Sequence, residues 1–154
     1  MTDSAERPQG FIARRSLGFL MRRAQKLMTQ QAEEVFAGCD LTLTQWIVLK
    51  LADEGLAATP GEAARMLGHN TGAMTRLIDQ LEGQGLIERR READDRRLVS
   101  LTLTPAGKHW ADVGGDHMRE FFDELLAVFT PAEVETMINL MSRLLERLEA
   151  RDTS

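Results

Sequence analysis

Two short helical segments separated by a tight turn lie in the middle of this chain of 154 residues. Thr59 can cap the first helix, Pro60 fits its first turn, and Glu62 can bond back to the cap amide. Gly68 is a plausible stop for that helix, and Asn70 is a favourable cap for the next one. We therefore expect a helix, a turn and a second helix in immediate succession.

The second helix is amphipathic and is expected to end near Gly83 or Gly85. Its apolar residues recur at the spacing of one buried stripe, namely Met74, Leu77, Ile78 and Leu81. Its other side carries Thr71, Gly72, Thr75, Arg76 and Asp79. The pattern predicts one face toward a core and the other face away from it.

Two short candidate strands, residues 86–91 and 98–103, follow the second helix, and a charged segment separates them. In the second run Val99, Leu101 and Leu103 alternate with polar residues, which is the period of a half-buried strand. The two runs predict a hairpin with a charged tip. Together with the preceding helices they form a helix-turn-helix with a wing, a combination far more specific than any of its parts.

Longer helices flank this stretch. Residues 11–37 place apolar side chains at helical spacing, and Gly38 follows as a stop. Thr42 and Gln45 have the form of a capping box, and the residues after them are apolar nearly all round. We expect the helix that they open to lie in the middle of the domain.

The C-terminal part of the chain predicts two more helices. The first, residues 104–129, contains Gly114 and Gly115, where we expect a bend or close packing. The second, residues 130–148, opens with a capping box and has an apolar stripe close to a heptad repeat. An apolar stripe of this regularity is typical of a helix that packs against a partner helix.

Charge is distributed unevenly within a net charge of −5. Basic residues gather in residues 7–26, which contain no acidic residue, and again in residues 89–97, whereas acidic residues dominate from residue 112 onward. The basic stretches suit an anionic polymer, although such runs are also typical of solvated helix faces.

Cys39 is the only cysteine, so no internal disulfide forms, and no Cys/His spacing of a structural zinc site is present. The longest early apolar run, residues 17–21, is far shorter than the roughly 20 residues that a membrane span needs. We expect a cytoplasmic protein with no membrane segment, metal or cofactor. The sequence offers no catalytic constellation, so we also expect no enzyme.

Five ordered motifs resemble the MarR family of bacterial transcriptional regulators: LG at 67–68, TRLIDQL at 75–81, GLI at 85–87, DRR at 95–97 and LTLTPAG at 101–107. The resemblance extends over about residues 11–148. It implies one MarR-like domain over residues 1–154, mainly α with a small β-hairpin. Residues 11–40 and 105–150 would be dimerisation helices, and residues 41–104 a winged helix-turn-helix DNA-binding lobe.

The N-terminal end of the recognition helix is the candidate surface for reading DNA, because that end reaches base edges in the major groove. Its residues are Asn70, Thr71, Gly72, Ala73, Thr75 and Arg76. Gly72 and Ala73 permit close approach, and Arg76 can bond bidentately to guanine or contact a phosphate. Alternatively, Asn70 is only a helix cap and Arg76 only a surface residue.

The resemblance also places a DNA-binding signature at the tip of the wing, Asp95, Arg96 and Arg97. It implies that Arg97 enters the minor groove and that Asp95 orients it. For the other arginines of the hairpin we expect contacts to phosphates: Arg89, Arg90 and Arg91. The alternative for the tip is a solvated turn with an exposed ion pair.

The expected function is that of a homodimeric, sequence-specific transcriptional regulator on an inverted-repeat operator. Members of the resembling family usually respond to small phenolic or aromatic acids, which implies a repressor released by such a ligand. The candidate ligand-binding residues are Phe19, Arg23, Trp46, Trp110 and His117. Ordinary core packing is the alternative for each of them. Two other functions stay open, a helical protein-interaction dimer without operator binding and a redox-sensing regulator that uses Cys39.

Overall fold

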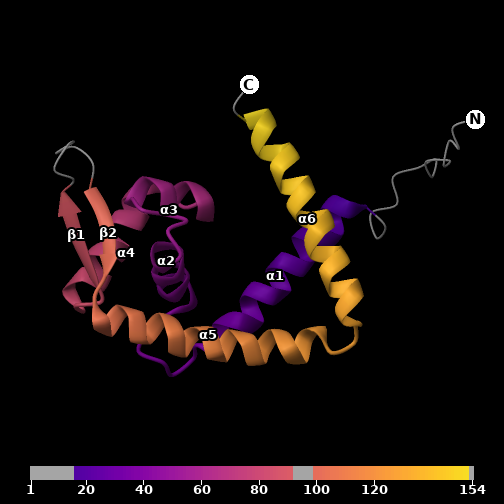
Figure 1. Cartoon of the computed structure of the whole chain (residues 1–154), viewed down its shortest axis with the longest axis horizontal. Coiled ribbons are helices and arrows are strands. Elements are labelled where there is room, and N and C mark those ends of the chain that lie inside the picture. Colours follow the sequence, from indigo (N-terminus) through magenta and orange to yellow (C-terminus); the bar gives the residue numbers. More distant parts are fainter. Residues whose placement is uncertain (1–15, 92–98, 153–154) are drawn as a thin grey trace, which may run out of the picture. The chain divides into compact units, whose positions relative to one another are not determined.

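The computed structural model describes residues 16–91 and 99–152. It is mainly helical with one two-stranded antiparallel sheet, which confirms the predicted fold class (Figure 1). The elements are α1 (Leu17–Val35), α2 (Leu43–Asp53), α3 (Pro60–Leu67), α4 (Thr71–Gly83), β1 (Ile87–Arg91), β2 (Val99–Leu103), α5 (Pro105–Leu126) and α6 (Pro131–Asp152). In Figure 1 the helices α2, α3 and α4 gather beside the β1–β2 hairpin.

Side-chain caps define where α2 and α3 begin. Thr42 Oγ1 accepts from the Gln45 N–H at 3.2 Å, and the Gln45 side chain accepts from the Thr42 N–H at 2.9 Å. Thr59 and Glu62 repeat this arrangement at 3.2 and 3.0 Å. Gly68 ends α3 with φ 63°, a left-handed conformation that glycine adopts without steric cost. The capping boxes predicted for α2 and α3 and the predicted stop at Gly68 are confirmed.

The core of this part of the chain is built around α2 and α4. Its largest fully buried side chains are Val48, Leu49, Met74, Ile78, Leu81 and Ile87. The stripe predicted for α4 is therefore buried, with Leu77 packed at its margin. The central position predicted for α2 is confirmed as well, because two of its residues belong to this fully buried set.

The hairpin is joined to the rest of this part of the chain by a backbone hydrogen bond and by a buried side chain of β2. Ile87 of β1 pairs with Leu103 of β2, and each strand begins one residue later than the sequence predicts. The Leu101 N–H donates to the Ala58 carbonyl at 2.7 Å, which joins β2 to the segment before α3. The Leu101 side chain is buried in the core, as its place in the alternating pattern indicates.

A threonine and a glycine connect the hairpin to α4 and α5. Thr104 Oγ1 donates to the Gly85 carbonyl at 2.6 Å and accepts from the Gly107 N–H at 3.0 Å. The Thr104 N–H donates to the Leu86 carbonyl at 3.1 Å. A Cβ atom at Gly107 would overlap that same carbonyl oxygen, so glycine is required there. These contacts give a physical reason for the LTLTPAG motif.

The chain divides into two compact units between Gly114 and Gly115, inside α5. The first half of α5 belongs to the first unit because Trp110 and Ala111 pack on its core. A Cβ atom at Gly114 would overlap the indole of Trp46. Of the two expectations, a bend or close packing, close packing is therefore the one observed at this glycine. The division thus falls further along α5 than the lobe boundary at residue 104 that the resemblance implies.

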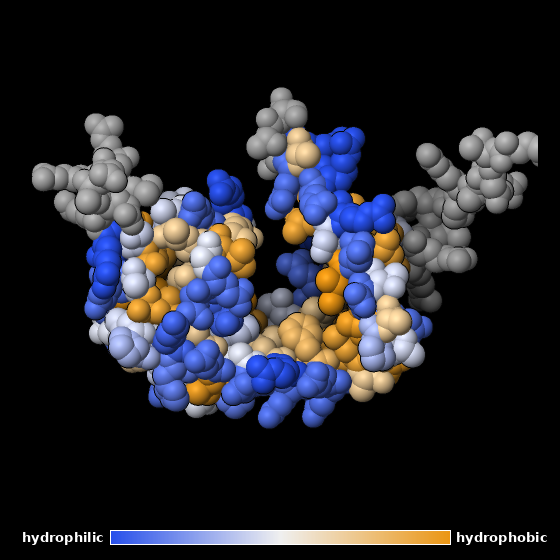
Figure 2. All heavy atoms as spheres, in the orientation of Figure 1, coloured by the Kyte–Doolittle hydropathy of each residue, from blue (hydrophilic) through white to orange (hydrophobic). Residues whose placement is uncertain are grey.

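Each unit leaves a large apolar surface exposed. In α1 the only buried residue is Ala32, and the exposed apolar side chains are Leu17, Phe19, Leu20, Leu27 and Met28. In the second unit none of residues 131–151 is buried. Its exposed apolar side chains include Phe122, Leu125, Val128, Phe129, Met137, Ile138, Leu140, Met141, Leu145 and Leu148. Figure 2 shows apolar side chains along α6 on the visible face. Exposed apolar surface of this extent is typical of an interaction site.

Candidate nucleic-acid interface

The N-terminal end of α4 is an exposed surface of small, polar and basic residues. Asn70 Oδ1 accepts from the Gly72 N–H at 2.8 Å, so Asn70 caps α4 as predicted. All the residues predicted to read DNA from this helix are exposed: Asn70, Thr71, Gly72, Ala73, Thr75 and Arg76. The structure therefore brings them together at one accessible end of one helix.

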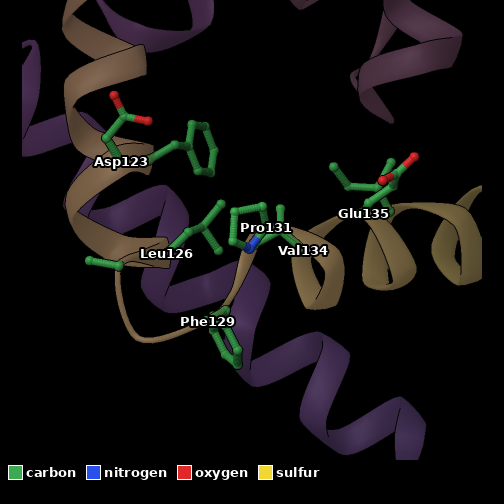
Figure 3. A pocket seen from close by; sticks show the side chains of 9 residues that line it. Asp123, Leu126, Phe129, Pro131, Val134 and Glu135 are labelled. Atoms are coloured by element: carbon green, nitrogen blue, oxygen red, sulfur yellow. The ribbon is translucent and has the colours of Figure 1, made fainter.

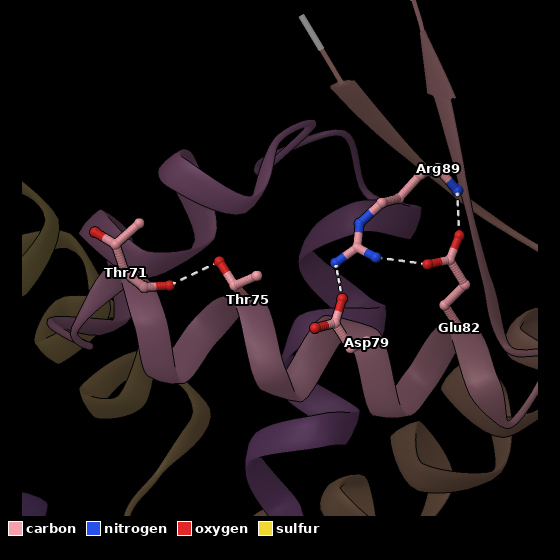
Figure 4. A network of polar contacts seen from close by, with 5 residues as sticks. All are labelled: Thr71, Thr75, Asp79, Glu82 and Arg89. Carbon is pink, nitrogen blue, oxygen red and sulfur yellow. Dashed lines mark hydrogen bonds and ion pairs between the residues drawn. The ribbon is translucent and has the colours of Figure 1, made fainter.

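The polar side chains at this end keep hydrogen-bonding capacity for a partner. Thr75 Oγ1 donates to the Thr71 carbonyl at 2.9 Å, and its lone pairs can still accept (Figure 4). Arg76 forms no hydrogen bond or ion pair with any residue that the structure describes. A guanidinium with all its donors available, beside exposed helix amides, suits phosphates and the acceptor edges of bases.

Arg89 of β1, for which the sequence predicts a phosphate contact, is paired here with two carboxylates. Its Nη2 donates to Asp79 Oδ1 at 2.6 Å and its Nη1 donates to Glu82 Oε2 at 2.5 Å, as Figure 4 shows. Both carboxylates belong to α4, so the guanidinium joins the hairpin to the recognition helix. Helical spacing predicts that Asp79 lies on the exposed face of α4, but it predicts no partner for Asp79 and no role for Glu82. The one available signal was the pair of acids a helical turn apart, followed shortly by a basic strand.

The electrostatics of Arg89 agree with this geometry. Partial burial by itself lowers the pKa of Arg89, but the hydrogen bond that Arg89 donates to Asp79 and the charges of Glu82 and Asp79 outweigh it and raise that pKa. The Arg89 side chain is 25% exposed, compared with 66% for Arg90. The Arg89 guanidinium is therefore held between two carboxylates, whereas most of the Arg90 side chain is exposed.

Arg90 is the accessible cation of β1 among the residues whose side chains are described. Its Nη2 lies 3.5 Å from Glu88 Oε2, in a pair that is exposed on both sides and weak for that reason. An exposed arginine of this kind can exchange a surface carboxylate for a phosphate. The predicted wing-tip residues Asp95, Arg96 and Arg97 lie outside the described residues.

The two tryptophans among the predicted ligand residues are engaged in packing. Trp46 Nε1–H donates to the Ala111 carbonyl at 3.0 Å, and the Trp46 ring lies 5.6 Å from the Phe36 ring, centroid to centroid. Trp110 packs against the core, with its ring 6.1 Å from that of His109. Core packing is thus sufficient to explain both tryptophans, and their role toward a ligand stays a prediction.

The other predicted ligand residues are on the surface. Phe19 and Arg23 are exposed on α1, and His117 is exposed in the second unit. An open apolar pocket of about 380 Å³ lies within the second unit, between the end of α5 and the start of α6 (Figure 3). Its charged lining groups, Asp123 and Glu135, are both carboxylates, so it does not favour an acidic ligand. None of the five predicted ligand residues lines this pocket.

Within residues 16–91 and 99–152 no group of three or more His, Cys, Asp or Glu side chains is arranged to hold a metal ion. No helix of that part of the chain combines the length and hydropathy needed to cross a membrane. Cys39 is half-buried, and its Sγ lies 3.9 Å from the Val35 carbonyl oxygen.

Two short helices joined by a tight glycine turn, the second with an exposed N-terminal end, and an attached hairpin define a winged helix-turn-helix DNA-binding protein. The model of the MarR family matches residues 41–99. The multiple antibiotic resistance protein MarR of Salmonella typhimurium is 35% identical over 109 residues, which make up 69% of this chain and 74% of that protein. The chain therefore belongs to the MarR family, whose members are transcriptional regulators that bind DNA and are not enzymes.

Further relatives agree with this assignment. The transcriptional repressor MprA of Escherichia coli is 28% identical over 112 residues, covering 73% of this chain and 64% of MprA. Wild-type MarR of E. coli in its apo form superposes with a TM-score of 0.73 at 27% identity, over 88% of this chain and 99% of that one. MepR of S. aureus, solved as a DNA complex, shares the fold with a TM-score of 0.69 at 23% identity, over 86% and 96% of the two chains. The predicted family, fold class and absence of enzymatic activity are confirmed.

Proposed function

We propose that this chain is a homodimeric repressor that reads an inverted-repeat operator with α4 in the major groove and is released by a small acidic ligand. The exposed end of α4 carries the proposal, because Arg76 there has no partner among the described residues. In this role Arg76 and Asn70 hydrogen-bond to base edges, while Gly72 and Ala73 let the helix approach closely. Thr71 and Thr75 supply hydroxyl groups for bases or phosphates.

The hairpin supplies the second part of the proposed interface. Arg90 contacts a phosphate, and at the tip Arg97 enters the minor groove with Asp95 and Arg96 beside it. A narrow, A·T-rich groove concentrates negative potential, so replacement of flanking A·T pairs by G·C weakens binding. That flank penalty disappears in Arg97→Ala. An equal penalty in both proteins means that Arg97 does not read the groove.

The apolar surfaces of α1 and the second unit support the homodimer. Regulators of this family bind DNA as dimers. Helices in residues 11–40 and 105–150 bury their apolar side chains against a second copy, and the lobe of residues 41–104 is presented to DNA. Two symmetric recognition helices then face two half-sites of one operator.

The proposed effector is a small phenolic or aromatic acid. BpsR of Bordetella bronchiseptica, which shares the fold, has its DNA binding regulated by 6-hydroxynicotinic acid. The basic groups available for a carboxylate are Arg23 and His117, and the aromatic side chains are Phe19, Trp46 and Trp110. Titration of the protein–operator complex with 6-hydroxynicotinic acid and hydroxybenzoates tests the class. Release that persists unchanged in Arg23→Ala and His117→Ala variants contradicts the assignment of these residues.

The salt dependence of duplex binding tests DNA binding itself. The protein competes with condensed counterions at each phosphate contact, so log affinity falls linearly and steeply with log salt concentration. A helical protein-interaction dimer without operator binding shows no retention on duplex DNA even at low salt. Fluorescence anisotropy with a labelled duplex over a salt series separates the two functions.

A further inference from the structure

Arg89 is held by two carboxylates of the recognition helix. Each of its terminal nitrogens has its own acceptor, Asp79 at 2.6 Å and Glu82 at 2.5 Å. The second Glu82 oxygen also lies 3.4 Å from the Arg89 backbone nitrogen, which donates to it. Glu82 therefore contacts both the side chain and the main chain of β1 (Figure 4).

The two terminal nitrogens of Arg89 form a fork, each donating to a different carboxylate, and only arginine has this planar geometry. A guanidinium presents its donors in a rigid plane, and two carboxylates placed to match that plane fix its orientation. The Arg89 side chain is also the least exposed of the three, at 25% against 56% for Asp79 and 41% for Glu82. One N–H of each terminal nitrogen is engaged, so the two carboxylates together fix where the guanidinium lies beside α4.

The two carboxylates would otherwise oppose DNA binding. Asp79 lies one helical turn beyond Thr75 and Arg76 on the exposed side of α4, and Glu82 lies one turn further. In the proposed complex α4 lies between two walls of phosphates, where uncompensated carboxylates are repelled. Arg89 supplies the compensating charge from the neighbouring strand.

We propose that Arg89 is a positioning residue, which neutralises Asp79 and Glu82 and fastens β1 to α4, so that hairpin and recognition helix approach DNA as one rigid body. Arg89 itself does not contact DNA. The inference rests on the proposed function, because it assigns Arg89 a part in operator recognition.

Four proteins test it: wild type, Arg89→Ala, Asp79→Asn/Glu82→Gln, and the triple variant. We expect Arg89→Ala to weaken operator binding roughly tenfold, a coupling typical of contacting charged residues. The carboxylate substitutions should raise affinity several-fold in the Arg89→Ala background but leave it unchanged or lower it in wild type. If they raise affinity equally in both backgrounds, Arg89 is not coupled to the carboxylates and the proposal is overturned.

The salt series distinguishes positioning from a phosphate contact. Loss of a phosphate contact reduces the slope of log affinity against log salt by about one. Arg89→Ala also exposes two carboxylates, whose repulsion is itself salt-dependent, so the slopes to compare are those of the triple variant and Asp79→Asn/Glu82→Gln. We expect these two slopes to be equal. Arg90→Ala is the matched control on the same strand, with a reduced slope. A slope lower by about one in the triple variant than in Asp79→Asn/Glu82→Gln would overturn the proposal. If wild type itself does not bind duplex DNA, the proposed function fails instead.

Arg89→Lys keeps the test decisive should Arg89→Ala not fold. Lysine retains the charge and can still meet a phosphate, but it cannot span both carboxylates in the fork geometry. We expect Arg89→Lys to weaken operator binding and to reduce the ratio of operator to random-duplex affinity. Unchanged binding in a folded Arg89→Lys protein would show that charge alone suffices and that the fork has no positioning role.

Discussion

Arg76 lies on the exposed face of α4 and has no hydrogen bond or ion pair to the residues that the structure describes. If it contacts a base edge, Arg76→Ala weakens operator binding by roughly 1–3 kcal/mol and random-duplex binding much less. Arg90→Ala removes an equally accessible charge from β1 and should weaken both duplexes about equally. Equal losses in Arg76→Ala, measured by anisotropy on the two duplexes, would make Arg76 a phosphate contact.

Arg76 and Arg89 also show which site residues the sequence predicts and which it does not. The exposure of Arg76 follows from helical spacing within α4, because the buried stripe fixes which residues face outward. The role of Arg89 depends on how β1 packs beside α4, and this contact joins residues ten positions apart on two different elements. Helical spacing alone does not reveal that contact, so the basic run predicts a phosphate contact for this arginine.

Within α5, Gly114 and its neighbour Gly115 differ sharply in surroundings. A Cβ atom at Gly114 would overlap the Trp46 indole, which the hydrogen bond to Ala111 holds in place, whereas Gly115 has nothing within 4 Å of that position. We expect Gly114→Ala to destabilise the fold by roughly 1–3 kcal/mol through overpacking. Gly115→Ala should stabilise α5 by about 0.5–1 kcal/mol, because alanine is the better helix former. Urea denaturation of both variants measures the difference, and equal effects would contradict the packing at Trp46.

The start of α6 contains the group whose pKa most clearly depends on a cap. Hydrogen bonds from the Thr130 N–H and then from the Thr130 hydroxyl hold the pKa of Glu133 below its ordinary value of 4.5. A carboxylate whose pKa is lowered by folding stabilises the folded state above its unfolded pKa and loses that contribution as pH falls through the folded value. Wild type should therefore melt at a higher temperature than Glu133→Ala at pH 7, with a smaller difference near pH 3. A constant difference in Tm across this range would show that the charge of Glu133 does not contribute.

The starts of α2, α3 and α6 can be predicted from the sequence because a capping box is a hydrogen-bonding motif between residues close in sequence. Thr42, Thr59 and Thr130 each meet an acceptor or donor three residues ahead, within the reach of one turn. The hairpin was predictable from its alternating pattern to within one residue at each strand start. The sequence does not decide between a bend and close packing at Gly114, because the neighbour Trp46 lies far away in the sequence.

The whole molecule exposes apolar side chains on α6 that a second copy can cover. We expect sedimentation at low micromolar concentration to show a dimer whose stability depends on protein concentration. Ile138 is 62% exposed, and Ile138→Glu places a charge on this surface. Leu56 is similarly exposed at 54%, but it lies in the first unit after α2, so Leu56→Glu is the control. We expect Ile138→Glu to shift the protein toward monomer and Leu56→Glu to leave the dimer intact; a monomeric wild type would contradict the interface.

At this level the sequence predicts an exposed apolar stripe on α6 but does not mark where the two compact units divide. The heptad-like stripe of α6 indicated a partner because its apolar residues have no counterpart nearby in the chain. The boundary inside α5 depends instead on which half of a continuous helix packs on the first core, through Trp110 and Ala111. Helical periodicity continues across that boundary and therefore does not mark it.

The most direct test of sequence-specific recognition is to select the sites that the protein binds from random duplex DNA. This measurement asks whether two recognition helices read one operator together. Two identical α4 helices related by a two-fold axis must read an inverted repeat, with half-site centres roughly 10 bp apart when both lie on one face of the duplex. We expect wild type to enrich such a repeat, and Arg76→Ala to lose enrichment at one base pair in each half-site. Recovery of duplexes with no shared inverted repeat would contradict operator reading by paired recognition helices.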